Sequence, residues 1–246
     1  MKKANWFILF LVLASLGALI AVGCGVTAKS AETGEPTSLP FMAGFFSYPM
    51  IYLISGEVDI SNFFFYATGE AVTSATVIVS NETTGVSTAL AYSASHLAYN
   101  LPTGVYDFPH GTGESVSLRI QTADGKTISG SPTATPNSSY RVITPASGAS
   151  VALPFDVTWE VTAGTSPATH SWLYVYQWGA TPEGYQVFLP ASQTSYQITS
   201  SHISGTGNYS VMVWPVNAMT VTGARSGSVA YVGSVATSTG RSISIH

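Results

Sequence analysis

The chain contains a single cysteine, Cys24, so thiol chemistry is restricted to one position. One thiol excludes an intrachain disulfide framework and a metal site built from several cysteines. Cys24 follows an apolar stretch from Trp6 to Val22 and the small residue Gly23. Two interpretations fit this position: a thiol modified after processing of a secretory signal, or a cysteine buried in a signal anchor. The spacing favours the first.

The residues before Cys24 have the three regions of a secretory signal peptide. Met1–Lys3 is basic, Trp6–Ile20 is apolar, and Ala21–Gly23 supplies small residues at a cleavage site. A transmembrane helix is the rival interpretation, since about 17–25 apolar residues can span a bilayer. The apolar run is marginal for that length and ends at a processing-like site without a charged flank. Residues 1–23 are therefore predicted to be a cleaved signal peptide.

The four residues Ala21-Val22-Gly23-Cys24 resemble the lipobox of bacterial lipoproteins, with Ala21 in place of the preferred leucine. The resemblance implies diacylglycerol on the Cys24 thiol, cleavage after Gly23 and acylation of the new amino group. Two or three chains would anchor the protein stably, because one chain alone binds a membrane only marginally. Gly25, where an aspartate would favour the inner membrane, implies the outer membrane if the source has one. Residues 24–40, rich in small and polar types, are predicted to form a flexible tether.

Histidine and carboxylate side chains show no spacing typical of a catalytic or metal site. The five histidines, none in an H-x-H or H-E-x-x-H pattern, are His96, His110, His170, His202 and His246. Because no pair matches a ligand spacing, we expect loop positions for them and no bound metal or cofactor.

Glu57 and Asp59 lie two residues apart, so on a strand they would share one face. Such a pair suits a cation or a glycosidase, and equally a solvated strand face, which we favour. No G-x-S-x-G nucleophile elbow occurs, although a dispersed Ser-His-Asp site keeps a hydrolase as a remote alternative. We therefore expect a protein that is not an enzyme.

Charged residues make up only 8% of the chain, against about 25% in an average soluble domain. Loss of Lys2 and Lys3 with the signal peptide would take the net charge from −4 to −6. A nucleic-acid partner needs a basic patch, and the basic residues of the mature chain are scattered singly. Nucleic acid is therefore excluded as a partner.

Aromatic residues supply the remaining candidate site. Trp172, Tyr174, Tyr176 and Trp178 alternate along one run, so on a strand their rings would share a face and could stack on a glycan. The runs at 41–50 and 63–66 place apolar residues at adjacent positions, so a strand there would point some of them outward. We favour packing between domains for these runs over a partner-binding or glycan-stacking surface.

From Leu39 onward, short apolar or alternating runs are separated by Gly, Pro, Asn and Asp, as in all-β sandwiches and barrels. Ser115–Ile120 alternates strictly, with Val116, Leu118 and Ile120 expected inside, and Ala123–Lys126 is a hairpin signal. A Pro- and Ser-containing stretch after Thr135 marks a boundary. The predicted domains are residues 41–136 and 141–246.

The second half resembles fibronectin type III and immunoglobulin-like domains. Phe155–Trp159 looks like their second strand with its core tryptophan, and Gly207–Val213 looks like their sixth strand, with Tyr209 at the tyrosine-corner position. The resemblance implies two β-sheets packed face to face, with Trp159 and Tyr209 in the core. It concerns fold and not function.

These observations predict an all-β protein of two immunoglobulin-like sandwiches, tethered by lipid to the bacterial cell envelope. The leading functional hypothesis is a non-catalytic module for contact with an envelope protein or surface. The alternative is a carbohydrate-binding accessory lipoprotein that uses the rings between Trp172 and Trp178.

Overall fold

The computed structural model describes residues 41–45, 50–54, 57–59, 66–68, 70–95, 97–102, 108–177, 184–233 and 238–246. Every regular element in these ranges is a β-strand, so the predicted all-β class is confirmed. These ranges contain no helix of the length and apolarity needed to cross a membrane. The predicted signal peptide, the lipid-attachment residue Cys24 and the tether to residue 40 lie outside the described residues.

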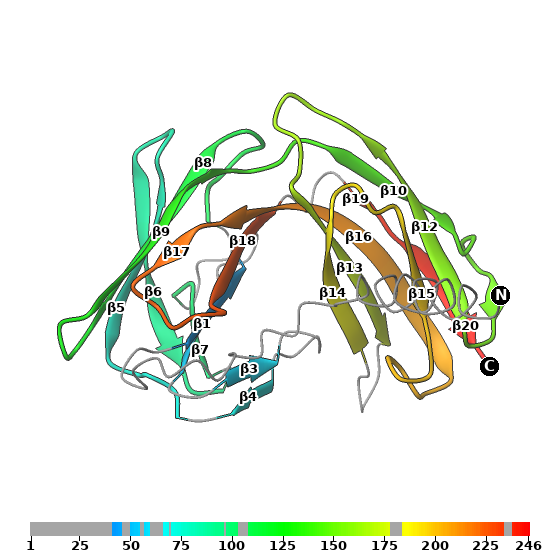
Figure 1. Ribbon diagram of the computed structural model, residues 1–246, viewed down its shortest axis with the longest axis horizontal. Coiled ribbons are helices and arrows are strands. Elements are labelled where there is room, and N and C mark those ends of the chain that lie inside the picture. The colour runs from blue at the N-terminus through cyan, green and yellow to red at the C-terminus, as the bar shows by residue number, and fades with distance from the viewer. Residues whose placement is uncertain are drawn as a thin grey trace, which may run out of the picture.

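The strands of the first half lie between residues 41 and 134 (Figure 1). In chain order they are β1 (Phe41–Phe45), β2 (Met50–Ile54), β3 (Glu57–Asp59), β4 (Tyr66–Thr68), β5 (Ala75–Asn81), β6 (Val86–Ser93), β7 (Ala98–Asn100), β8 (Ser115–Thr122) and β9 (Thr127–Ala134). The predicted alternation is confirmed in β8, where Val116, Leu118 and Ile120 are buried. The predicted hairpin is also present, since Gly125 takes a positive φ of 83° between β8 and β9.

Strands of the second half begin directly after a four-residue connection. They are β10 (Ser139–Thr144), β11 (Ser150–Val151), β12 (Phe155–Thr162), β13 (His170–Gln177), β14 (Gly184–Pro190), β15 (Ser195–Ile198), β16 (Gly207–Met219), β17 (Val221–Thr222), β18 (Val229–Gly233), β19 (Ser238–Thr239) and β20 (Arg241–Ile245). Their β-branched and aromatic residues suit a pleated surface that is buried on one or both faces.

The second half is a β-sandwich. One sheet has the strand order β15-β12-β10-β19. The facing layer contains β14, β13, β16 and β20, all paired antiparallel to their neighbours. The core between the layers takes alternate residues from both, for example Val157 from β12 and Leu173 from β13. The predicted two-sheet packing of this half is therefore present.

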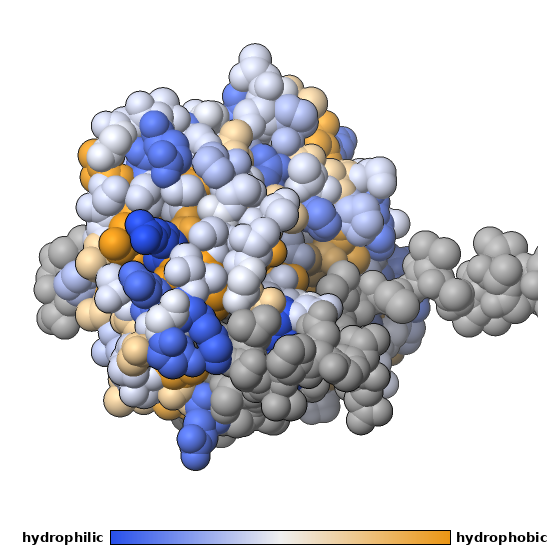
Figure 2. Space-filling view, turned by 60° about the vertical axis from the view of Figure 1, so that its left-hand side comes forward, coloured by the Kyte–Doolittle hydropathy of each residue, from blue (hydrophilic) through white to orange (hydrophobic). Residues whose placement is uncertain are grey.

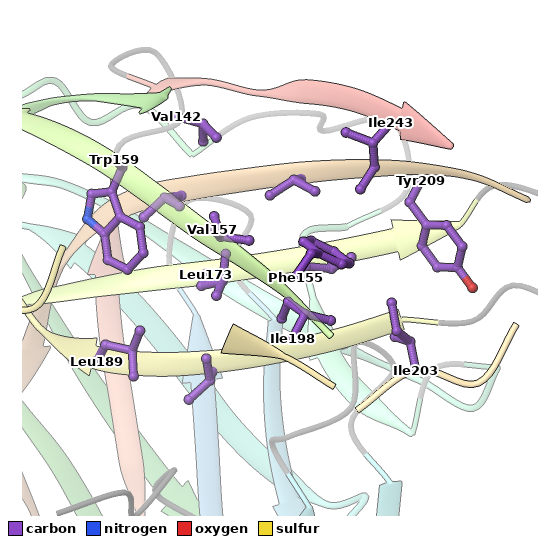
Figure 3. Packing of buried hydrophobic residues seen from close by; sticks show 14 of the residues in the cluster. Val142, Phe155, Val157, Trp159, Leu173, Leu189, Ile198, Ile203, Tyr209 and Ile243 are labelled. Carbon is purple, nitrogen blue, oxygen red and sulfur yellow. The ribbon is translucent and has the colours of Figure 1, made fainter. Parts of the chain in front are cut away.

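Trp159 and Tyr209 both lie in this core, as the sequence predicts. Their side chains are 3% and 1% exposed, and they lie toward opposite ends of the packed residues in Figure 3. The Trp159 indole Nε1 has no hydrogen-bond partner among the described residues. The Tyr209 hydroxyl donates to the carbonyl oxygen of Gly205 at 3.2 Å, a bond from the strand back to the preceding loop. This bond is the defining contact of a tyrosine corner.

Replacing Tyr209 with phenylalanine is expected to lower the free energy of unfolding by about 0.5–1.5 kcal/mol, the usual contribution of one internal hydrogen bond. The ring stays in the core, while the carbonyl of Gly205 loses its donor. Urea denaturation followed by tryptophan fluorescence measures the change. Unchanged stability would mean that the tyrosine corner does not hold this loop.

The first half also has two layers, which strand pairing joins at one edge and the continuous chain from β16 to β17 joins at the other. One layer contains β6, β5, β8 and β9, and the other contains β7, β2, β1 and β18. At one edge β6 pairs with both β5 and β7. At the other edge β9 pairs with β17, which follows the end of β16 after the single residue Thr220. Joined edges leave fewer unpaired backbone groups open to other chains.

One strand belongs to both halves. β16 pairs with β13 and β20 in the second half, and its last four residues pair with β18, which in turn runs parallel to β1 (Figure 1). Met219 at the end of β16, and Ala230 and Val232 in β18, belong to the core of the first half. Met219 lies so close to Gly130 in β9 that a Cβ at that position would clash with its sulfur atom. The C-terminal part of the chain thus completes the N-terminal core.

Residues between the two halves are held firmly. The backbone N–H of Thr135 donates to Glu114, and that of Asn137 donates to Ser166, both to carbonyl oxygens. Asn217 in β16 joins both sides, because its amide donates to the carbonyl of Ala134 and its side-chain oxygen accepts from the N–H of Thr169, each at 2.7 Å. The division into folding units at 41–136 and 141–246 stays a prediction.

The described surface is polar but carries few charges. Figure 2 shows a face on which pale and hydrophilic residues predominate and hydrophobic residues occur in separate patches. Two ion pairs are present among the described residues, Lys126–Asp124 and Arg141–Glu160. Both are exposed, and such pairs contribute little to stability. Solubility of this surface therefore depends on hydroxyl and amide groups.

Candidate functional site

Three of the predicted stacking residues share one face of β13. Trp172, Tyr174 and Tyr176 alternate with Leu173 and Val175, which point the other way into the sandwich core. This arrangement follows from the two-residue period of a strand. The fourth predicted residue, Trp178, lies outside the described residues, as does the predicted lipidation site Cys24.

Neighbouring strands add further rings to this face. Trp214 in β16 lies opposite Trp172, with ring centroids 4.7 Å apart and planes nearly perpendicular. Phe188 in β14 lies on the other side of Trp172, at 5.7 Å and nearly parallel. Phe188 also stacks on Tyr231 of β18 at 4.0 Å. We call the surface formed by Trp172, Tyr174, Tyr176, Phe188, Trp214 and Tyr231 the aromatic face.

Rings of the aromatic face are largely buried. The side chains of Trp172, Tyr174 and Tyr176 are 6%, 3% and 6% exposed. The indole Nε1 of Trp172 donates to the side-chain oxygen of Gln186 at 3.1 Å. Burial raises the pKa of Tyr174, and it raises that of Tyr231 to about 12. A glycan needs ring faces that it can reach, so the role of these residues as a stacking platform stays a prediction that requires exposure of the face.

Phe188, Trp214 and Tyr231 are site residues that the sequence analysis did not identify. Each lies in its own strand among other apolar residues, so nothing local distinguishes it from a core residue. The pairing of Trp172 with Phe188 and Trp214 depends on the register of three strands. Position-by-position alternation in β14 and β16 could have suggested the face, but not which rings meet.

A second aromatic group lies at the side of the same sandwich. The hydroxyl groups of Tyr185 in β14 and Tyr196 in β15 share a hydrogen bond of 2.7 Å. The ring of His202 stacks on Tyr185 with centroids 4.2 Å apart. All three side chains are partly exposed. We call these three residues the Tyr–His cluster. It was not predicted, because its members come from two different sheets and a loop.

Hydrogen bonding fixes the tautomer of the neutral His202 ring. The backbone N–H of Thr199 donates to its Nδ1 at 3.1 Å, so the neutral ring carries its proton on Nε2. Burial lowers the pKa of His202. Burial also raises the pKa of Tyr185, and the bond to Tyr196 raises it further. Tyr185 and His202 are therefore both uncharged at neutral pH.

Stability is expected to fall as the pH drops below about 6.5, the ordinary pKa of histidine. Burial lowers the pKa of both His170 and His202 in the folded chain, so the unfolded chain binds more protons in this range. The free energy of unfolding is therefore largest above about pH 6.5. It decreases as the pH falls from there through the folded pKa values. Urea midpoints between about pH 7.5 and 5.5 measure this slope.

The double variant His170→Gln and His202→Gln provides the control for this pH dependence and should flatten the slope. Asp124 does not interfere, because hydrogen bonds from Lys126 and Thr122 hold the pKa of its carboxyl at about 2, well below the range measured. A slope that persists in the double variant would contradict the assignment to these two histidines.

Several carboxylates of the described residues are engaged in structural contacts near turns. Glu114 accepts from the backbone N–H of Gly111 and from the Asn81 amide, and these bonds lower its pKa. Glu82 accepts from Ser117. In the part of the chain that the structure describes, no three His, Cys, Asp or Glu side chains gather where they could hold a metal ion. Glu57 and Asp59 lie in β3, paired with Thr68 and Tyr66.

Comparison with known proteins gives a distant likeness in structure only. No protein-family model matches the sequence, and no curated protein sequence matches it. Fibronectin(III)-like modules of Clostridium thermocellum CbhA align with 85% of this chain and 90% of their own, at 10% identity and a TM-score of 0.24. The FN1–FN3 domains of chicken CNTN1 align with 83% of this chain and 63% of their own, at 8% identity and a TM-score of 0.26.

The chicken interferon gamma receptor alpha chain aligns with 83% of this chain and 98% of its own, at 9% identity and a TM-score of 0.22. Because these scores are low, the fold assignment depends on the strand pairing of the chain itself. Two facing sheets and the tyrosine corner of Tyr209 make the second half an immunoglobulin-like β-sandwich.

Proposed function

We propose that this chain is a non-catalytic, lipid-anchored protein of the bacterial cell envelope that presents β-sandwich modules for contact with other molecules. The observation that carries the proposal is the position of Cys24, the sole cysteine, at the end of the apolar stretch and before the first described strand at Phe41. Acyl chains on one thiol and one amino group would hold the module at the membrane without a protein span.

The described fold supports a role in contact. A fibronectin type III-like sandwich is a scaffold whose function depends on its surfaces. The carboxylates at the turns are engaged in hydrogen bonds that hold the scaffold together, as Glu82, Glu114 and Asp124 illustrate. The weakly charged surface suits recognition through hydroxyl, amide and aromatic groups.

Replacing Cys24 with serine is expected to abolish lipid attachment, because no other residue in the chain offers a thiol. Metabolic labelling with an alkyne fatty acid, followed by membrane fractionation, measures the effect. The wild-type chain should carry the label and sediment with membranes. The variant should carry none and keep its signal peptide.

Ser30→Ala is a matched control, since it changes one hydroxyl in the predicted tether and should leave labelling intact. Label persisting on the Cys24→Ser variant would refute the lipid anchor. Membrane retention of the variant does not separate the two interpretations, because its uncleaved apolar segment also binds the membrane. A wild-type chain that sediments with membranes but carries no label would instead support the rival transmembrane interpretation.

Carbohydrate binding is the second candidate function. The juxtaposition of Trp172, Tyr174 and Tyr176 on one face favours it, because sugar rings stack on aromatic side chains. Their burial requires a rearrangement before a glycan could reach them. A glycan array and a pull-down from envelope extracts would separate a sugar ligand from a protein partner.

A further inference from the structure

We infer that the Tyr–His cluster of Tyr185, Tyr196 and His202 is a shallow binding site for a neutral sugar ring, separate from the aromatic face. This inference goes beyond the proposed anchoring and display, because it names a ligand class and a site. It holds or fails whether or not Cys24 carries lipid.

The position of the cluster makes it reachable. β14 pairs with β13, and β15 pairs with β12, so within the described residues these two strands are the edges of opposite sheets. Tyr185 and Tyr196 reach from these edges across the side of the sandwich, and their inner surfaces pack against the core. Their outer surfaces remain partly exposed, whereas Trp172, Tyr174 and Tyr176 of the aromatic face are buried.

The rings form a preorganised stack, in which His202 covers one face of Tyr185 and leaves the outer rings to meet a ligand. Tyr185 is inclined by 20° to Tyr196 and by 21° to His202, with centroids 6.1 and 4.2 Å away. Near-parallel rings held by each other and by the core lose little entropy when a ligand binds. Aromatic surface with a few fixed polar groups is the usual composition of a small-molecule site, and the C–H face of a sugar is the matching apolar surface.

The cluster also offers hydrogen-bond donors at its rim. Two hydroxyls that share one hydrogen bond leave one of their two protons available. His202 uses Nδ1 as an acceptor for Thr199, which leaves the Nε2 proton to donate. Hydrogen-bond donors beside an aromatic stack match a sugar ring, which has hydroxyl oxygens at its edge and C–H groups on its face.

Charge narrows the ligand to a neutral sugar. Tyr185 and His202 are uncharged at neutral pH, because burial raises the pKa of Tyr185 and lowers that of His202. Their hydrogen bonds and ring contacts are with each other and with Thr199, which carries no charge. If these residues only closed the side of the sandwich, aliphatic side chains would serve better, since half-buried polar groups cost desolvation free energy.

Saturation-transfer NMR on the full chain in a sugar-free detergent tests the site. The probes are neutral hexasaccharides of glucose, mannose and N-acetylglucosamine. We expect transfer to at least one of them, with binding weakened about tenfold by Tyr196→Ala and by His202→Ala. Tyr196→Phe should weaken binding less, because it keeps the ring. Tyr92→Ala, which alters a partly exposed tyrosine of the first half, should leave binding unchanged.

Urea midpoints of each variant separate loss of binding from loss of folding. No transfer to any probe up to about 10 mM, beyond the range of specific weak binding, would overturn the inference. Binding that survives both Tyr196→Ala and His202→Ala would also overturn it, because the sugar would then bind elsewhere. Neither outcome bears on the lipid anchor, which the labelling of Cys24 decides separately.

Discussion

Replacing Trp159 with alanine is expected to lower the free energy of unfolding by about 3–5 kcal/mol, through lost burial and a residual cavity. The indole is 3% exposed and belongs to the core of the second half, where it lies near Leu189 and Val142 (Figure 3). A loss of this size is a large share of the roughly 5–15 kcal/mol that stabilises a typical domain. Urea denaturation followed by circular dichroism measures it.

Trp159→Phe is the matched control. Phenylalanine keeps most of the apolar volume, and no hydrogen bond is lost, because the indole Nε1 has no partner among the described residues. Removing a buried, unpaired N–H offsets part of the lost contact, so this variant should cost much less than Trp159→Ala. A midpoint of Trp159→Ala equal to that of the wild type would contradict the core position and remove the main support for this packing.

Val232→Asp should destabilise the chain by about 3–5 kcal/mol or more, because it leaves an unpaired charge in a core. Val232 is fully buried in the core of the first half, although it belongs to the C-terminal part of the sequence. It lies there because β18, which pairs with the end of β16, also pairs with β1 of the first half. The effect should therefore be largest in the first half, far from the mutation in sequence.

Tryptophan fluorescence distinguishes the halves, because the tryptophans after Cys24 are Trp159, Trp172, Trp178 and Trp214. If β16 couples the halves, fluorescence and circular dichroism should shift together to lower urea. An early dichroism transition with unchanged fluorescence would show that the two halves unfold independently. Val86→Asp, at a position 41% exposed in the first half, is the matched control and should have little effect.

These expectations differ in how far the sequence could support them. Trp159 and Tyr209 could be placed in the core because Phe155–Trp159 and Gly207–Val213 resemble the second and sixth strands of fibronectin type III and immunoglobulin-like domains. The inward residues of β8 could be predicted in the same way. The contribution of Val232 and Met219 to the first core could not, because it depends on β18 lying parallel to a strand from the other end of the chain.

The candidate sites show the same division. The sequence predicted correctly that Trp172, Tyr174 and Tyr176 share a face, since a strand has a two-residue period. It could not predict their burial, because the intervening Leu173 and Val175 are also apolar and either face could be the inner one. The Tyr–His cluster escaped prediction altogether, since Tyr185 and Tyr196 meet across two sheets that do not pair at that edge.

The sequence by itself therefore determined the strand class, the turn at Gly125 and the inward side of the strictly alternating strand β8, because these depend on neighbours a few residues away. It also carries the lipobox-like end of the signal segment, which is a linear motif. Only the tertiary structure decided which strands share a sheet, which aromatic rings are buried and which remain at the surface. Those properties depend on strand register and on contacts between residues far apart in the chain, which local patterns do not specify.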